Sequence, residues 1–511
     1  MTEKESGSIY VGQPLVLVAQ QDPLLKAPSE ALLLFGFEDG ESTDSLRAVD
    51  ELLGGWLTES RSRGEFRGDA AQVVVVPTFL ALDPTPAVRI ALVGLGKRRD
   101  LDLRTFRNAV TAALRTLGKR GIRTAAVDVA GLPLAAADAG EAAAEAAELS
   151  LFRVDIHRSG AHRDEAIHEL RICGASTDVV KRGSALGRAK NFARDLVNEP
   201  GNILDAVELA RRASAMAERT GLSCQVFGAE ELAELEMGAF LAVARGTARP
   251  PRLIILRHEP RSMPRDGAPV LVLVGKAVTF DTGGISLKPS AEMGRMKGDM
   301  AGGAAVVGAM QAIAELNVPA RVIGLVPAVN NMPDADAWMP GDVIRAMSGK
   351  TIETISTDAE GRMLLADTVH YAGVLGGTHV VDIATLTGAC VTALGHTASA
   401  LFGTDGELVR LIQECGDASG ERHWPMPLFS DYRELIRSDI ADLKNSGGRA
   451  AGSITGAWFI REFAGDIPWA HLDIAGSSQF EKARPWAPAG PTGTGVGTFV
   501  RLAERLSVRH R

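Results

Sequence analysis

The chain has 511 residues, too many for one ordinary hydrophobic core, so we expect two domains or three. Its hydrophobic content of 46% and charged content of 23% are those of an ordinary globular protein. The net charge of −8 excludes an overall basic field, so we expect neither a nucleic-acid partner nor binding to an anionic membrane.

The N-terminus, MTEKESGS, is polar and lacks the apolar core of a signal peptide. The apolar runs further on, such as LVLVA and VLVLV, are far too short to cross a bilayer. Four cysteines lie far apart and form no CxxC pair, so they suggest neither a disulfide framework nor a zinc knuckle. We therefore expect a cytoplasmic protein without a membrane segment.

Residues 1–175 predict a first, smaller α/β domain. Short apolar runs, among them ALLLFGF and VRIALVGLG, alternate with helical stretches such as TFRNAVTAALRTLGKRG. An Ala/Glu-rich run at residues 135–148 has high helix propensity and no aromatic anchor, so we expect a solvated helix there. We place a polar helical linker at residues 176–191.

Residues 192–511 predict a second, larger α/β domain with a mainly parallel central sheet. The strand-like runs RLIILRH, PVLVLVG, ARVIGLVPAV, HVVDIATL and WAHLDIAG are separated by helical patterns. With a weaker strand at residues 351–355, they suggest a sheet of about six strands, near the usual size.

The chain is organised around residues 270–367, where four carboxylates and three cations gather: Lys276, Asp281, Lys288, Asp299, Asp358, Glu360 and Arg362. Strand-like runs at residues 270–274 and 351–355 precede them, and helical patterns follow at residues 300–316 and 362–375. In parallel α/β sheets ligands bind outside the carboxyl ends of the strands, where these side chains are expected.

This charge pattern favours a metal site. Asp358 and Glu360 are separated by one residue, so both side chains should leave the strand on the same side. Crowded carboxylates repel one another unless cations neutralise them, and two divalent ions about 3.5–4 Å apart would do so. Oxygen ligands suit magnesium or manganese, and zinc where the geometry compensates. Any one residue alone fits an ion pair, but burying all seven for stability is unrewarding.

These residues resemble the leucyl aminopeptidases, also called cytosol aminopeptidases. The family signature Asn-Thr-Asp-Ala-Glu-Gly-Arg is similar to residues 356–362, and its Gly-Lys-Gly-x-x-Phe-Asp-x-Gly-Gly stretch is similar to residues 275–284. The resemblance extends from about residue 198 to the end, through NMP, LTGA, ADLKNSG and WAHLDIAG. Ser356 replaces the signature Asn, and Ala277 replaces the second Gly of Gly-Lys-Gly. Neither departure removes a ligand, so we expect activity to survive.

The resemblance implies a role for each site residue. The metal ligands would be Lys276, Asp281, Asp299, Asp358 and Glu360. Asp281 and Glu360 would bridge two ions, manganese or zinc. Lys276 can coordinate only when neutral, so two dications must bring its pKa far below the usual ~10.4.

The resemblance also implies the catalytic groups and the specificity pocket. Lys288 would stay protonated and act as an electrophile, and Arg362 would hold a bicarbonate ion as general base. The pocket for the first side chain would be lined by Met296, Thr385, Leu386 and Gly388. Its largely apolar character fits leucine-like residues.

The implied activity is that of a dinuclear-metal aminopeptidase. A metal-bridging water would attack the first peptide bond of a substrate with a free N-terminus. The resemblance further implies a homohexamer. One alternative is a dinuclear hydrolase of phosphate esters, for which Lys288 and Arg362 would form only a thin phosphate cradle. Another is a non-catalytic or DNA-binding scaffold, against which the acidic charge and the complete set of site residues count.

Overall fold

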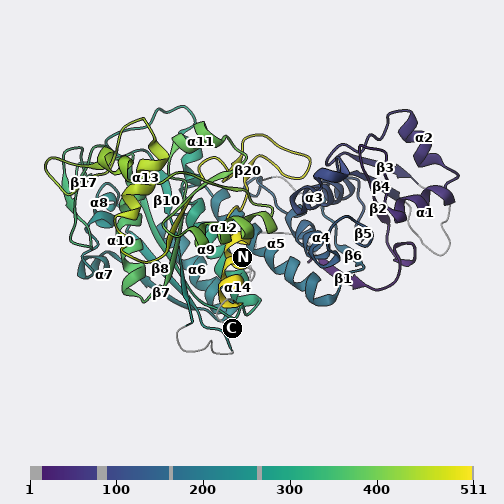
Figure 1. Ribbon diagram of the computed structural model, residues 1–511, viewed down its shortest axis with the longest axis horizontal. Coiled ribbons are helices and arrows are strands. Elements are labelled where there is room, and N and C mark those ends of the chain that lie inside the picture. Colours follow the sequence, from purple (N-terminus) through teal and green to yellow (C-terminus); the bar gives the residue numbers. More distant parts are fainter. Residues whose placement is uncertain (1–13, 78–88, 160–164, 262–267, 509–511) are drawn as a thin grey trace. The chain divides into compact units, whose positions relative to one another are not determined.

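The computed structural model describes residues 14–77, 89–159, 165–261 and 268–508 (Figure 1). The polar N-terminal run at residues 1–8 lies outside the described residues. The chain forms two compact units, one made mainly of Ser8–Asn191 and the other mainly of Phe192–Phe480 and Pro491–Arg511. Within the described ranges, no helix is long and apolar enough to cross a membrane.

The N-terminal unit is built on a six-stranded sheet. In sheet order its strands are β1 (Val16–Gln20), β6 (Glu169–Cys173), β5 (Thr124–Asp128), β2 (Ala31–Gly36), β4 (Arg89–Gly94) and β3 (Val73–Pro77). All neighbouring strands are parallel except β3, which pairs with β4 in the antiparallel sense.

Helices lie on both faces of this sheet. Those of the unit are η1 (Leu24–Lys26), α1 (Asp44–Leu52), α2 (Trp56–Ser62), η2 (Arg98–Asp100), α3 (Leu103–Lys119), α4 (Ala136–Ser150) and α5 (Thr177–Asn198), of which α5 continues into the other unit. Because successive strand residues point to opposite faces, Leu33 and Phe35 pack with α3 and α4, while Leu32 and Leu34 pack on the α1 side.

The prediction of a solvated helix at residues 135–148 is wrong. Almost every residue of α4 from Ala139 onward is buried. Alanines allow α4 to pack closely against α3 and α5, and Gly183 and Gly187 of α5 leave no room for a Cβ beside it. A charged glutamate of α4 is paired inside the unit: Glu145 lies 3.1 Å from Arg107 and 2.8 Å from Lys190.

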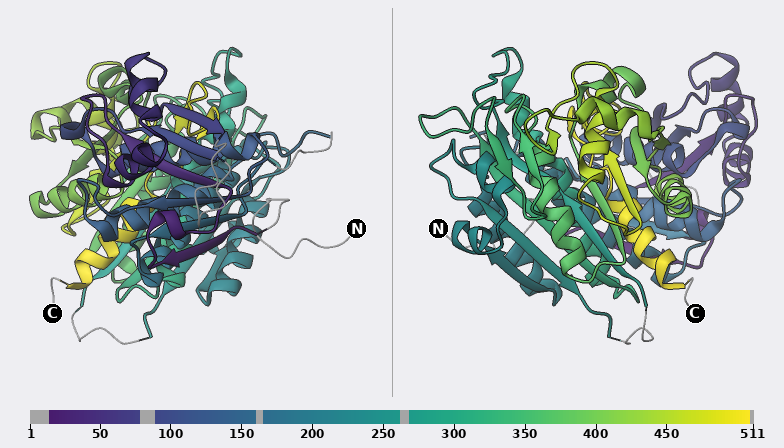
Figure 2. Two further views of the ribbon diagram at one scale, coloured as in Figure 1. Left: turned by 90° about the vertical axis from the view of Figure 1, so that its right-hand side faces the viewer. Right: turned by 60° about the vertical axis from the view of Figure 1, so that its left-hand side comes forward.

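The larger unit is built on a nine-stranded mixed sheet. In sheet order its strands are β16 (His423–Pro425), β15 (Ser399–Gly403), β18 (Trp469–Asp473), β14 (His379–Ala384), β9 (Val270–Gly275), β11 (Arg321–Asn331), β8 (Arg252–His258) and β7 (Ser223–Phe227), and β10 (Ala277–Asp281) pairs with β11. The central strands β18, β14, β9, β11 and β10 are mutually parallel (Figure 2). The predicted α/β class with a mainly parallel central sheet is confirmed.

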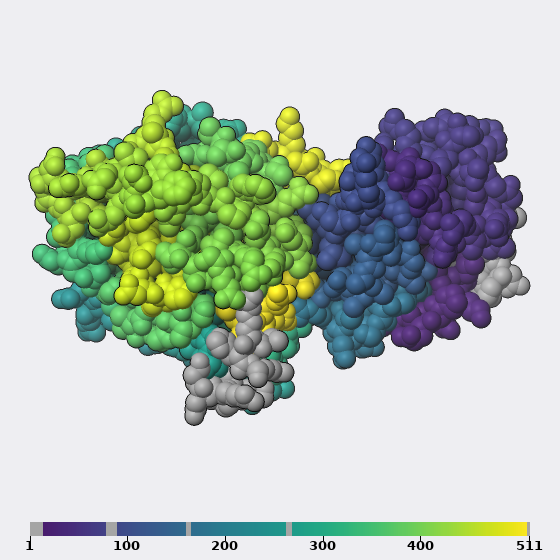
Figure 3. Space-filling model, viewed as in Figure 1, coloured from purple at the N-terminus to yellow at the C-terminus, as the bar shows by residue number. Residues whose placement is uncertain are grey.

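Helices cover both faces of the large sheet. They are α6 (Ala206–Thr220), α7 (Ala229–Glu234), α8 (Gly238–Ala244), η3 (Met293–Gly298), α9 (Ala301–Glu315), α10 (Glu360–Val374), α11 (Gly388–Leu394), α12 (Gly406–Ala418), η4 (Ser430–Ile436), α13 (Gly452–Arg461) and α14 (Val496–Val508). One layer joins α6, α9, α12 and α14, and the other joins α8, α10 and α13. Much of the visible face of this unit in Figure 3 comes from the C-terminal part of the chain, coloured green to yellow.

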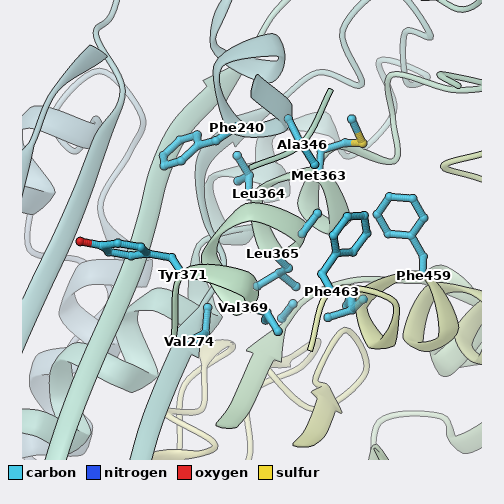
Figure 4. Packing of buried hydrophobic residues seen from close by; sticks show 14 of the residues in the cluster. Phe240, Val274, Ala346, Met363, Leu364, Leu365, Val369, Tyr371, Phe459 and Phe463 are labelled. Carbon is cyan, nitrogen blue, oxygen red and sulfur yellow. The ribbon is translucent and has the colours of Figure 1, made fainter. Parts of the chain in front are cut away.

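Alternation along the central strands explains this layering. Val272 and Val274 of β9 belong to the core beneath α10 and α13, where Val274 packs among side chains that include Leu365 and Phe463 (Figure 4). Position 324 of β11 is directed to the opposite layer, since a Cβ at Gly324 would contact Met310 of α9. The predicted strand at residues 270–274 and the helices at residues 300–316 and 362–375 are confirmed as β9, α9 and α10.

The weak strand predicted at residues 351–355 forms, but outside the central sheet. It is β13 (Thr351–Glu353), the middle of a small sheet with β12 (Val343–Arg345) and β17 (Leu443–Lys444). Only Ile352 of β13 is fully buried, so this strand is too short and too polar for the two-sided core of the large sheet. Five of the six predicted strands do belong to that sheet, and a short pair, β19 (Gln479–Phe480) with β20 (Gly490–Pro491), lies apart from it.

The buried charges of α4 provide a test of stability. Glu145→Ala would remove the carboxylate that contacts both Arg107 and Lys190 inside the unit, so we expect the free energy of opening α4 to fall by about 3–5 kcal/mol. Hydrogen exchange of the α4 amides, resolved by mass spectrometry, measures it. The exposed pair Arg63–Glu59 is the control, and Glu59→Ala should cost less than about 1 kcal/mol. Equal protection in both variants would contradict this account.

Candidate metal centre and active site

Five polar residues stand where the parallel strands of the large sheet end. Lys276 follows β9, Asp281 ends β10, Asn331 ends β11, Thr385 follows β14 and Asp473 ends β18. Because these strands run the same way, their carboxyl ends meet along one edge of the sheet, as expected for a ligand site in this class. Asp281 and Asn331 are direct register partners.

The remaining carboxylates reach this edge from other segments. Asp299 lies between η3 and α9, Asp358 lies in the turn after β13, and Glu360 is the first residue of α10. One ligand oxygen from each of Asp281, Asp358 and Glu360 can be chosen so that all three lie within 4.8 Å of one another. The Asp-x-Glu pair thus points to one site, although it lies in a turn and a helix start, not in the extension of a strand.

Lys276 is buried at the centre of these carboxylates. Its Nζ lies 2.8 Å from Asp299 Oδ2 and 2.7 Å from Glu360 Oε1, and it donates a hydrogen bond of 3.0 Å to the carbonyl oxygen of Thr385. Burial opposes the charge on this lysine, but the carboxylates of Asp299, Glu360 and Asp281 outweigh burial and raise its pKa. The carboxylates alone therefore favour the ammonium form.

Lys288 bridges the two remaining carboxylates. Its Nζ lies 2.7 Å from Asp281 Oδ2 and also pairs with Asp358. Burial raises the pKa of the Asp358 carboxyl, an effect that Lys288 opposes. Burial also raises the pKa of Asp299, and the nearby carboxylates of Glu360 and Asp281 add to the shift.

The donor set fits divalent metal ions. Glu360 is almost fully buried, yet its Oε2 has no hydrogen-bond partner among the residues that the structure describes. A buried carboxylate oxygen without a partner is costly, and a cation beside it would remove the penalty. Carboxylate oxygens gathered around such a point are ligands that hard divalent cations prefer.

Polar side chains support this centre, and sequence analysis assigned no role to two of them, Asn331 and Thr357. Asn331 donates from Nδ2 to Asp281 Oδ1 at 2.8 Å and to the Thr357 carbonyl at 2.9 Å. The hydroxyl of Thr357 donates to the Gly283 carbonyl at 2.6 Å, and that of Thr385 donates to Asp299 at 2.8 Å. Asn331 and Thr357 thereby tie the loop after β10 to the turn that carries Asp358.

The predicted catalytic arginine lies in the first turn of α10. Arg362 is buried and donates from Nη1 to the Asn445 carbonyl at 2.7 Å. Burial lowers the pKa of its guanidinium, and Glu360, Asp473 and Asp358 counteract that shift. A Cβ at Gly456 of α13 would lie 3.3 Å from Nη2 of this arginine, so glycine leaves room for the guanidinium.

The predicted pocket residues occupy two segments. Leu386 follows β14 and its amide donates to Asp473 Oδ1 at 3.2 Å. Its side chain and Arg362 both lie within 3.4 Å of the position that a Cβ at Gly456 would take. Met296 is half-buried in η3, three residues before Asp299, and Gly388 is exposed at the start of α11. The structure therefore brings Thr385 and Leu386 to the centre more directly than Gly388.

Both departures from the family pattern have a local explanation. The hydroxyl of Ser356 accepts a hydrogen bond of 3.2 Å from the amide of Asp358, a local bond that an Asn side chain also makes. The methyl group of Ala277 faces Gly303 of α9, where a second Cβ would lie only 2.7 Å away. Glycine at position 303 thus makes room for alanine at position 277.

Carboxylates and lysines at the carboxyl edge of a parallel sheet form a candidate site for divalent metal ions. Residues 191–500 match the catalytic domain of the cytosol aminopeptidase family, and residues 32–160 match its N-terminal domain. A probable cytosol aminopeptidase of Geotalea uraniireducens is 42% identical over 493 residues, which cover 95% of this chain and 98% of that one. Another, from Koribacter versatilis, is 40% identical and covers 93% and 97%.

Solved structures agree with these matches. The bottromycin maturation enzyme BotP in complex with Mn is 36% identical, with a TM-score of 0.82 and coverage of 94% of this chain and 100% of that one. A mutant of tomato leucine aminopeptidase is 32% identical, with a TM-score of 0.87 and coverage of 97% of each chain. The chain belongs to the cytosol aminopeptidase family. It is a peptidase of the hydrolase class with aminopeptidase activity.

The hydrogen bond from Asn331 to Asp281 predicts an effect on metal binding. Asn331→Ala removes the group that orients this carboxylate, and loss of such a supporting contact typically weakens metal affinity ~10–100-fold. Isothermal titration with Mn²⁺ at fixed pH measures the change. Asn317→Ala, between the C-terminal end of α9 and the N-terminal end of β11 and so at the ends of these elements opposite Asp299 and Asn331, is the control and should bind like the wild type. An unchanged affinity in Asn331→Ala would contradict the assigned contact.

Proposed function

We propose that the centre holds two divalent ions and that the enzyme releases leucine-like residues from the free N-terminus of peptides. The observation that carries this proposal is the convergence of Asp281, Asp358 and Glu360, with ligand atoms within 4.8 Å of one another, beside the buried Lys276 and Asp299. With Lys276 neutral as a ligand, one divalent ion and the Lys288 ammonium supply only three positive charges against four carboxylates, whereas two divalent ions supply four.

The ligands divide between the two ions as the family resemblance implies. Asp281, Asp358 and Glu360 would hold the ions, together with Asp299 and with Lys276 in its neutral form. Bound there, two divalent ions supply Lewis acidity for a peptide carbonyl and acidify a water molecule. Lys276 lies against the carboxylates that raise its pKa, so its loss of a proton accompanies metal binding.

Lys288 and Arg362 are the proposed catalytic side chains that do not bind metal. Burial lowers the pKa of Lys288, but in the metal-free site Asp281, Glu360 and Asp358 outweigh burial and raise it. Lys288 is not a metal ligand in this scheme, so it can keep its proton. Its ammonium stabilises the negative charge that develops on the carbonyl oxygen during attack. Arg362 presents a planar guanidinium beside the centre, which suits a bidentate oxyanion such as bicarbonate acting as general base.

Substrate choice follows from the pocket and from the free amine. Met296, Thr385 and Leu386 offer a largely apolar wall for the first side chain, and Gly388 leaves space beside them.

We further propose manganese or zinc as the ions, a homohexamer as the assembly and the cytoplasm as the location. The names of the relatives, which are cytosol aminopeptidases, support the location, and the manganese complex of BotP supports the metal.

Hydrolysis of leucine p-nitroanilide tests the proposed function. Purified protein should cleave this substrate after addition of Mn²⁺ or Zn²⁺ but not without metal, and it should not cleave the N-acetylated analogue. Asp358→Ala should abolish the activity, because a metal ligand is lost. Asp336→Ala, an exposed aspartate of the same unit, should leave the activity unchanged. Absence of cleavage with every metal would refute the aminopeptidase mechanism.

The role of Lys288 leads to a separate kinetic prediction. Lys288→Met at saturating metal should lower kcat by ~10²–10³-fold, the usual effect of losing one oxyanion-stabilising donor, with a smaller change in KM. Lys288→Arg keeps the positive charge and should retain more activity than Lys288→Met. Steady-state kinetics on leucine p-nitroanilide distinguish these outcomes. Equal kcat values for Lys288→Met and the wild type would exclude this role.

A further inference from the structure

The buried side chain of Asn445 extends the small three-stranded sheet. Asn445 follows β17, whose last register pair with β13 joins Lys444 to Glu353. Beyond that pair, Asn445 Oδ1 accepts hydrogen bonds from the amides of Ile355 at 2.8 Å and Ser356 at 3.3 Å. Its Nδ2 donates to the Ser356 carbonyl at 2.7 Å. The side-chain amide thus continues the pairing where the backbone of β17 no longer does.

The main chain of Asn445 also forms hydrogen bonds with residues 353–362. Its amide donates to the Glu353 carbonyl at 2.9 Å, and its carbonyl accepts from Nη1 of Arg362 at 2.7 Å. All five of these hydrogen bonds therefore end on residues 353–362, the segment that carries Asp358 and Glu360. The Nε of Arg362 is buried and has no hydrogen-bond partner among the described residues, so the bond to Asn445 is a principal restraint on the guanidinium.

We propose that Asn445 is a positioning residue for the metal centre, an inference that rests on the proposed function. It fixes the path of residues 355–358 and the direction of the Arg362 guanidinium, and so determines where two carboxylates and one cation meet the substrate. Asp358 is more exposed than the other carboxylates and lies in a turn, so it depends on such an external restraint more than Asp281, which ends a buried strand.

Only an amide side chain can make these contacts. Asn offers a donor and an acceptor on one short side chain, whereas Asp of the same shape offers only acceptors. Asn445→Asp would keep the bonds from Ile355 and Ser356 but would set a carboxylate oxygen against the Ser356 carbonyl. The variant would lose the hydrogen bond to the Ser356 carbonyl, and the turn at residues 355–358 would move away from position 445. The volume of the side chain at position 445 would change little.

A merely structural role in holding the small sheet together is the competing explanation. The same pair of strands has a second side-chain clamp at its other end, where Asp442 Oδ2 accepts from the amide and the hydroxyl of Thr351, each at 2.8 Å. Asp442→Ala removes that clamp without touching residues 355–362. It is therefore the matched control for the strand pairing itself.

The test compares Asn445→Asp, Asp442→Ala and the wild type in the full-length protein. Mn²⁺ affinity is measured by electron paramagnetic resonance at fixed pH, and kcat and KM are measured with leucine p-nitroanilide at saturating Mn²⁺. For Asn445→Asp we expect Mn²⁺ binding weakened ~10–100-fold and kcat lowered at least ~10-fold, with KM changed less than ~3-fold. Asp442→Ala should stay within about twofold of the wild type in all three quantities.

Two results would overturn the proposal. One is wild-type Mn²⁺ affinity and kcat in a folded Asn445→Asp variant, and the other is an equal loss in Asp442→Ala. If Asn445→Asp does not fold, Asn445→Ser provides the same comparison, because a single hydroxyl cannot bond to Ile355 and the Ser356 carbonyl together. If the proposed function is wrong, the wild-type protein will bind Mn²⁺ but cleave no peptide. In that case the Mn²⁺ affinities of the variants still show whether Asn445 positions the metal centre.

Discussion

Repulsion among buried carboxylates is the constraint on which the catalytic unit depends. Asp281, Asp299 and Glu360 are buried at the end of the sheet, where water is too scarce to screen their charges, and the more exposed Asp358 lies beside them. Lys276 and Lys288 each contact two of them, so no carboxylate of the four is without a cation. Four carboxylates and two lysines leave the site with an excess of negative charge that favours divalent cations. The rest of the unit keeps the four carboxylates from separating.

Close packing of backbone against backbone provides that rigidity. A Cβ on Gly302 would lie 2.2 Å from the Ile383 carbonyl of β14, and one on Gly275 would lie 2.5 Å from the Gly302 carbonyl. The start of α9 therefore rests directly on the strands that lead to Lys276 and Thr385. Since Asp299 lies two residues before Ala301, the first residue of α9, this contact fixes a carboxylate and a lysine relative to each other without long side chains between them.

The long periodic elements were predictable from the sequence, and so was the gathering of charges at strand ends. β9 is wholly apolar, α9 is apolar for most of its length, and the apolar residues of α10 recur at helical spacing between its polar residues. Contacts distant in the sequence were not predictable: α4 is buried because Lys190 and Arg107 neutralise Glu145, and β13 joins a strand about ninety residues later. Asn331 and Asn445 escaped assignment for the same reason, although each lies in a stretch that resembles the family.

The contacts between α4 and α5 determine the order in which these helices can fold while the chain is being synthesised on the ribosome. The last strand of the N-terminal sheet ends at Cys173, but Glu141 pairs with Arg182, and Ser184 donates to Glu148 at 2.6 Å. A nascent chain that has exposed only the six strands would therefore hold its α4 glutamates without these partners. Stable docking of α4 must await the emergence of α5 from the exit tunnel, so the two units share a helix that the first unit needs in order to finish folding.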